Sequence, residues 1–221
     1  MSAVGLGYRL TASHLLLQNM VIAIGASTGG TEATLQVLKD LPADMPGIVV
    51  TQHMPGGFTQ MYASRLDRLC AMRVREAKDG DLVEQGLVLL APGGDRHVRV
   101  VKDGWHYRIR CVPGEKVSGH RPSVDVLFQS VASSVGRNAV GVILTGMGQD
   151  GARGLLAMRQ AGAYTIGQDK ESSLVYGMPM EAYRQGACCV QAPCDSIALL
   201  LIKYINGFHL GGGGDTQTKK I

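Results

Sequence analysis

The sequence predicts an α/β protein in which a mostly parallel, doubly wound sheet is covered by helices on both faces. Short apolar runs of strand length alternate with segments of helical spacing from residue 21 onwards, which is typical of a parallel sheet. A two-residue turn signal, Asp103-Gly104, joins two strand-like flanks and predicts an antiparallel hairpin near one edge. The first apolar run leads directly into a glycine-rich turn, GASTGG, and then into a helix. This turn follows the carboxyl end of the strand, and in open α/β folds ligands bind at the carboxyl ends of the strands.

The individual elements follow from periodicity and from the residues at their ends. Thr31 and Glu32 suit the start of a helix, and Pro42 follows its end. Gly136 and Gly162 end two later helices. Strands are predicted at 21–27 and 48–54, as short pieces within 74–92, as the hairpin 98–110, and at 139–146, 163–169 and 188–191. Helices are predicted at 31–42, 58–70, 123–136, 151–162, 178–187 and 196–207.

Length and composition favour one medium-sized domain. The chain has 221 residues, 45% of them apolar and 18% charged, as in ordinary soluble globular proteins. We expect a leader or linker remnant at 1–19, one folded domain at 20–207 and a disordered tail at 208–221. No run is long and apolar enough to span a bilayer, so we expect a cytoplasmic protein without membrane insertion.

Charge and cysteine content exclude other classes. The net charge of +4, with 5% aromatic residues and no basic run along the body, gives nucleic-acid binding little support. The five cysteines form no C-x-x-C pair, so reduced thiols are expected rather than a disulfide framework. The adjacent pair Cys188-Cys189 with Cys194 fits zinc spacing poorly, and no metal site is expected.

The glycine-rich turn at 25–30 admits several interpretations. A nucleotide P-loop needs a lysine after the last glycine, where this chain has Thr31. A dinucleotide-binding turn needs a carboxylate at the end of the second strand, where this chain has Gln52 and His53. The letters G-A-S-T-G match the nucleophile elbow of α/β-hydrolases, but the order Ser…His…Asp differs from that fold. A serine at a helix N-terminus, where backbone N–H groups favour negative charge, explains more of the pattern.

Three polar side chains follow apolar strands and together predict a nucleophilic hydrolase. Ser27 needs a base, and His53 lies at the end of the next strand, so the two side chains can meet across adjacent strand ends. Asp150 follows a later buried strand and would orient the base, although an aspartate there could also cap the following helix. The Thr28 hydroxyl and the backbone N–H groups of the turn 146–148 could hold the oxyanion.

The other histidines are weaker candidates for the base. They are His14 in the leader, His106 in the hairpin, His209 beside the tail, and His97 and His120 in loops, of which the last two remain open.

With these positions assembled, the chain resembles the catalytic domain of the chemotaxis receptor methylesterases, the CheB family. The resemblance covers nearly all of 20–205. It rests on the motifs IGASTGGTEA (24–33), TQHMPGGFT (51–59), LLAPGGDRHV (89–98), HRPSVDVLF (120–128), ILTGMGQDGARGL (143–155) and VYGMPMEA (175–182). It implies a three-layer α/β/α sandwich, with 20–207 as the methylesterase domain. It also implies hydrolysis of γ-glutamyl methyl esters on chemoreceptors with release of methanol, and, in related enzymes, deamidation of receptor glutamines. The family's catalytic residues fall on Ser27, His53 and Asp150, and its oxyanion contributors on Thr28 and the Met147 backbone. His120 and Arg121 fall in a loop that borders the cleft, and they are candidate substrate contacts.

The resemblance implies a methylated chemoreceptor as partner, no cofactor and no metal, and we expect a monomer. A phosphorylating chemotaxis kinase would act only on a receiver domain outside this chain, since no acidic cluster of that kind precedes residue 20. Met180 stands where the family usually has arginine. Two other classes stay open, a dinucleotide-dependent oxidoreductase and a receptor-binding module without catalysis.

Overall fold

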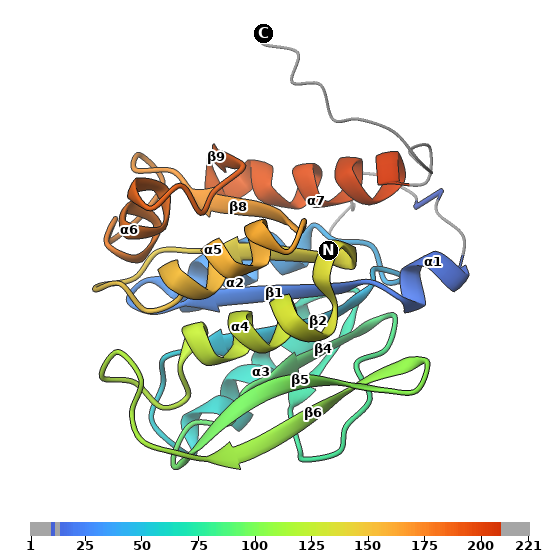
Figure 1. The fold of residues 1–221 in the computed structure, drawn as a ribbon, viewed down its shortest axis with the longest axis horizontal. Coiled ribbons are helices and arrows are strands. Elements are labelled where there is room, and N and C mark those ends of the chain that lie inside the picture. Colours follow the sequence, from blue (N-terminus) through green and yellow to red (C-terminus); the bar gives the residue numbers. More distant parts are fainter. Residues whose placement is uncertain (1–9, 12–13, 209–221) are drawn as a thin grey trace, which may run out of the picture.

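The computed structural model describes residues 10–11 and 14–208, and within them a seven-stranded sheet forms the centre of the molecule (Figure 1). The strands are β1 (Val21–Ala26), β2 (Gly47–Gln52), β3 (Arg73–Glu76), β4 (Leu87–Leu90), β7 (Ala139–Ile143), β8 (Tyr164–Gln168) and β9 (Val190–Ala192). Their order is β3-β4-β2-β1-β7-β8-β9, and every neighbouring pair is parallel. Because the order reverses direction at β1, a crevice is expected at the carboxyl ends of β1 and its neighbours.

Helices cover both faces of this sheet. They are α1 (His14–Gln18), α2 (Gly30–Lys39), α3 (Phe58–Leu69), α4 (Val124–Ser134), the 3₁₀ turn η1 (Gly136–Asn138), α5 (Ala152–Gln160), α6 (Met178–Arg184) and α7 (Cys194–Phe208). Figure 1 shows α4 and α5 in front of the sheet, with α2 and α3 behind it.

Alternate residues of β1 belong to two separate cores. Ile22 and Ile24 pack in the core that α2, α3 and α7 share. Val21 and Ala23 pack in the core of α4, α5 and α6. Since successive strand residues point to opposite faces, a strand with a core on each side must be apolar throughout. This confirms the predicted three-layer sandwich.

The predicted hairpin is present but forms a sheet of its own. Strands β5 (Arg96–Asp103) and β6 (His106–Pro113) pair antiparallel with each other. Asp103 pairs with His106, so the two turn residues are Gly104 and Trp105 rather than Asp103 and Gly104. Gly104 has φ 59° and stands first of the two turn residues, while Trp105 is not among the described residues with positive φ, as in a type II′-like turn. The buried face of the hairpin, including Val100, packs into the same core as α4.

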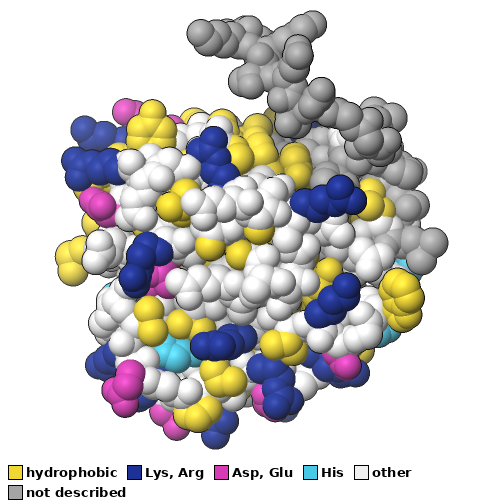
Figure 2. Space-filling view, viewed as in Figure 1, with side chains coloured by type: hydrophobic (Ala, Val, Ile, Leu, Met, Phe, Trp, Pro, Cys, Tyr) yellow, Lys and Arg dark blue, Asp and Glu magenta, His cyan; other side chains and the backbone are white. Residues whose placement is uncertain are grey.

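The remaining expectations fall partly outside the described residues. Helix α1 lies within the segment predicted as a leader, and its Leu17 is buried in the core. The predicted tail lies beyond the described residues apart from Phe208, which ends α7. Among the helices described, none is both long and apolar enough to cross a membrane. Figure 2 shows Lys and Arg side chains scattered over one face of the molecule with acidic side chains between them.

Candidate active site

The sheet places the three predicted catalytic residues at the ends of three adjacent strands. Ala26 is paired with Gln52 of β2, and Gly25 with Ile143 of β7. Ser27 therefore follows the central strand, while His53 and Asp150 come from the segments after the strands on either side of it. Backbone bonds continue past the strand ends, since the His53 amide donates to the Ala26 carbonyl at 3.1 Å. The predicted edge is the one at which these residues lie.

His53 and Asp150 form a buried pair. The Nε2 of His53 lies 2.8 Å from Oδ2 of Asp150, and their side chains are 8% and 1% exposed. Nε2 therefore carries the proton that the carboxylate accepts, which leaves Nδ1 as the basic nitrogen. That Nδ1 is buried and has no hydrogen-bond partner among the described residues.

Asp150 is held by the N-terminus of α4. Its carboxylate accepts the Ser123 hydroxyl at 2.7 Å and the backbone N–H groups of Val124 and Asp125 at 2.7 and 3.0 Å. The alternative role of Asp150 as cap of the following helix is therefore wrong, because Gly151 occupies that N-cap position without a side-chain bond. The carboxylate caps a helix that precedes it in the chain instead.

This setting lowers the pKa of Asp150. Burial by itself raises the pKa of a carboxyl group, but the hydrogen bonds from His53, Ser123 and the two α4 amides favour the ionised form more strongly. The residue is therefore a carboxylate at neutral pH, as an orienting group for a histidine must be.

A second buried carboxylate, that of Asp125, joins α4 to α5. Asp125, in the first turn of α4, is fully buried and accepts the backbone N–H of Gly154 in α5 at 2.8 Å. Burial raises its pKa, and the nearby charge of Asp150 adds to the rise. Sequence reasoning missed Asp125 and Ser123, although the predicted helix start at residue 123 was the available signal.

The turn that carries Ser27 is held by Gln52. The Ser27 carbonyl accepts the side-chain amide of Gln52 at 2.8 Å and the N–H of Gly30 at 2.7 Å. A Cβ on Gly30 would lie 2.6 Å from the Cβ of Ala26 and would crowd Oε1 of Gln52, so a larger residue there would have to displace one of these side chains. Gln52 stands where a dinucleotide-binding protein needs a carboxylate, and its donors are already used on the serine turn.

The structure records no hydrogen bond between Ser27 and His53 within the described part of the chain. Ser27 is partly exposed, and the Nδ1 of His53, which has no partner among the described residues, is the acceptor that its hydroxyl would need. In enzymes without substrate this bond is often long and tightens in the complex.

The predicted oxyanion donors come from the turn after β1 and the loop after β7. Thr28 is exposed, and Met147 is 71% exposed in the loop after β7. The Gly146 amide, which we expected as a donor, is engaged by the Val175 carbonyl at 3.0 Å. The Met147 amide has no partner within the described residues, and a glycine at 146 lets this loop approach the Cβ of Ser27.

A cavity of about 270 Å³ opens beside His53. It is lined by His53, Met54, Pro55, Lys116, Gly119, His120, Arg121 and Pro122. The imidazole of His120 stacks on that of His53, with ring centroids 3.7 Å apart. Arg121 lines the cavity and donates to the Gly114 carbonyl at 2.6 Å, so it also fixes the loop.

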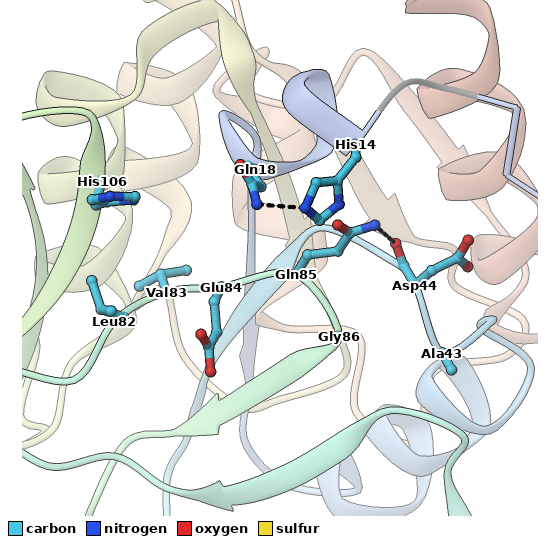
Figure 3. A pocket seen from close by; sticks show the side chains of 10 residues that line it. All are labelled: His14, Gln18, Ala43, Asp44, Leu82, Val83, Glu84, Gln85, Gly86 and His106. Atoms are coloured by element: carbon cyan, nitrogen blue, oxygen red, sulfur yellow. Dashed lines mark hydrogen bonds between the residues drawn. The ribbon is translucent and has the colours of Figure 1, made fainter.

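Another cavity of about 530 Å³ lies away from this site, beside α1 and the start of β4 (Figure 3). Its two histidines, His14 and His106, stand apart from each other, and His14 accepts a hydrogen bond from Gln18 at 2.7 Å. Its described lining holds no serine, threonine or cysteine beside a base and a carboxylate, so its size does not make it the reactive site. Across the described residues no group of three or more His, Cys, Asp or Glu side chains could hold a metal ion.

The departure at Met180 lies in the first turn of α6 and is partly buried. That helix begins beside the Met147 loop, because the Met178 amide donates to the Gly146 carbonyl at 2.8 Å. Met180 therefore lies two positions along the chain from the residue that bonds to the Met147 loop.

The geometry agrees with comparisons to known proteins. The family model described as CheB methylesterase matches residues 22–201. The chain is 54% identical over 93% of its length to a protein-glutamate methylesterase/protein-glutamine glutaminase 2 of Syntrophomonas wolfei, and 51% identical over 89% to the corresponding protein of Escherichia coli O157:H7. It spans 62% and 56% of those relatives. The crystal structure of the Thermotoga maritima CheB methylesterase catalytic domain matches 84% of this chain and 98% of its own, with a TM-score of 0.81 and 35% identity. This chain belongs to the CheB methylesterase family.

Proposed function

We propose that this chain is a serine esterase that hydrolyses γ-glutamyl methyl esters on the cytoplasmic domains of chemoreceptors, and so acts in chemotactic adaptation. The observation that carries the proposal is the buried His53–Asp150 pair with an unpartnered Nδ1, since His53 follows the strand that neighbours the one leading to Ser27. Names of relatives with up to 56% identity support both the methylesterase activity and a glutaminase activity.

In the proposed mechanism His53 takes the hydroxyl proton of Ser27 through Nδ1, while its Nε2–H stays hydrogen-bonded to the Asp150 carboxylate. The serine oxygen attacks the ester carbonyl, and the Met147 amide and Thr28 hold the resulting oxyanion. Removing one such donor typically costs about 3–4 kcal/mol of transition-state stabilisation. The proton returns from His53 to the departing methoxide, methanol leaves, and water repeats the steps to release the glutamate. With a glutamine substrate the same sequence releases ammonia.

The substrate surface is proposed to include His120 and Arg121, which line the cavity beside His53. The proposed setting is the cytoplasm, with the enzyme as a monomer that needs no cofactor and no nucleic acid. A chemotaxis kinase would regulate it only through a receiver domain on another segment or chain.

The direct test is methanol release from methylated receptor fragments. Ser27→Ala should abolish release and leave the melting temperature nearly unchanged, and His53→Gln should be severely impaired. His106→Gln, in the exposed hairpin, is the matched histidine control and should behave like the parent. Full activity of Ser27→Ala, or equal losses in the two histidine variants, would contradict the assignment.

A fluorophosphonate probe separates the proposal from a binding module without catalysis. We expect covalent labelling of Ser27 that is lost in Ser27→Ala and slowed in His53→Gln. A protein that binds methylated receptor but is not labelled would be such a module.

A further inference from the structure

The ring of His120 covers the ring of the proposed general base. The two imidazole centroids are 3.7 Å apart and the ring planes differ by 10°, so the contact is face to face. The residues come from distant segments, since His53 follows β2 while His120 lies in the loop between β6 and α4. The resemblance to methylesterases implied only a substrate contact for His120, and it did not suggest this stacking.

The loop holds His120 in place through its backbone. Val117 and His120 exchange two backbone hydrogen bonds, of 3.1 and 2.9 Å. The neighbouring Arg121 donates to the carbonyls of Gly114 and Gly94, at 2.6 and 3.4 Å. The His120 side chain itself has no hydrogen bond to another described residue. Stacking on the His53 ring is therefore the contact for which the loop positions the His120 side chain.

The surroundings of His120 favour its neutral form. The charged or titratable groups around it are His53, Asp150, Lys116 and the adjacent Arg121. Burial lowers the pKa of His120, and a charge on His53 or Lys116 lowers it further, against the opposing effect of Asp150. At neutral pH the ring facing His53 is therefore an uncharged imidazole.

We propose that His120 is a positioning residue for His53 and that it works only as a neutral ring. Its face keeps the His53 ring in the plane in which Nε2 meets Asp150 and Nδ1 is directed to the serine side. When His53 becomes an imidazolium during the reaction, a neutral stacked π face can accept that charge, whereas a protonated His120 would repel it. The inference rests on the proposed function where methyl ester hydrolysis is measured, but the activation of Ser27 by His53 can be tested without that substrate.

The consequence is that activity should require both imidazoles to be neutral, which the pH profile of kcat/KM can show. Because protonation of either ring should inactivate the parent, the logarithm of its kcat/KM should fall towards acid pH with a limiting slope of two. In His120→Phe an aromatic ring remains on His53 and the second titration is removed, so the slope should fall to one whatever the height of the plateau. In His120→Ala the stack is lost, and the plateau should fall by about tenfold or more.

The experiment measures methanol release from methylated receptor fragments between about pH 4 and 9, with circular dichroism at each pH to confirm folding. His106→Phe is the control and should keep the slope of two. The same series is run with the fluorophosphonate probe at Ser27, which needs no receptor. If the slope of the labelling profile falls by one in His120→Phe while the parent releases no methanol, the role of His120 is supported and the methylesterase proposal is contradicted.

Two results would overturn the inference. One is an acid limb of His120→Phe that keeps the parent's slope in probe labelling. The other is a folded His120→Ala whose plateau labelling rate equals that of the parent.

Discussion

Replacing Ser123 by alanine should show how much the α4 N-terminus contributes to the site. The Ser123 hydroxyl makes a 2.7 Å hydrogen bond to the Asp150 carboxylate and accepts the Val126 amide at 3.4 Å as the cap of α4. A hydrogen bond to a charged group contributes about 1.5–3 kcal/mol, and an N-cap about 1 kcal/mol. Because both carboxylate and hydroxyl are buried, solvent does not replace the lost donor. The expected loss in unfolding free energy is therefore about 2–4 kcal/mol.

The pH dependence of this loss has a definite sign. The pKa of Asp150 is lowered in the folded protein, so its ionisation stabilises the fold above the unfolded pKa of about 3.9, and this stabilisation is lost as the pH falls through the folded pKa. Ser123→Ala moves the folded pKa back up, towards the unfolded value. The stability difference between parent and variant should therefore be largest near neutral pH and shrink below about pH 4.

Urea unfolding at neutral and acid pH measures this difference, and methanol release measures its effect on the site. A less firmly held Asp150 orients His53 less well, so we expect kcat/KM to fall by about tenfold to a hundredfold. Ser133→Ala removes an exposed serine from the same helix, whose hydroxyl bonds only to nearby α4 carbonyls, and should change stability by less than about 0.5 kcal/mol. A Ser123→Ala protein as stable and active as Ser133→Ala would refute the reasoning.

The remaining predictions concern glycines whose neighbours decide the outcome. Gly154→Ala places a Cβ 2.6 Å from the Cβ of Phe128 and 2.9 Å from a backbone oxygen of α4, so we expect a loss of about 1–3 kcal/mol by urea unfolding. Gly30→Ala crowds Gln52, so fluorophosphonate labelling of the folded variant should be slower than that of the parent. An unchanged labelling rate would contradict the role of Gln52 in holding the serine turn. Gly207→Ala in α7 meets no described atom within 4 Å and should raise the melting temperature by roughly 1–4 °C, because alanine favours the helix.

The three-layer fold could be predicted because its signal is local and repeated. Continuous apolar runs identify strands buried on both faces, and β1 shows this directly, with Ile22 in one core and Val21 in the other. The hairpin was predicted as well, but not that it forms a sheet separate from the main one. Its turn was misplaced by one residue, because pairing of Asp103 with His106 is a matter of register between strands and not of turn residues alone.

By itself the sequence determined that a serine, a histidine and an aspartate follow strands that end at one edge, since parallel strands bring their carboxyl ends together. Only the tertiary structure decided what surrounds them. Asp150 caps α4 rather than α5, and His120 stacks on His53 across a gap of more than 60 positions. Such contacts depend on how helices and loops pack on the finished sheet, where distances of a few ångström bear no relation to separation along the chain.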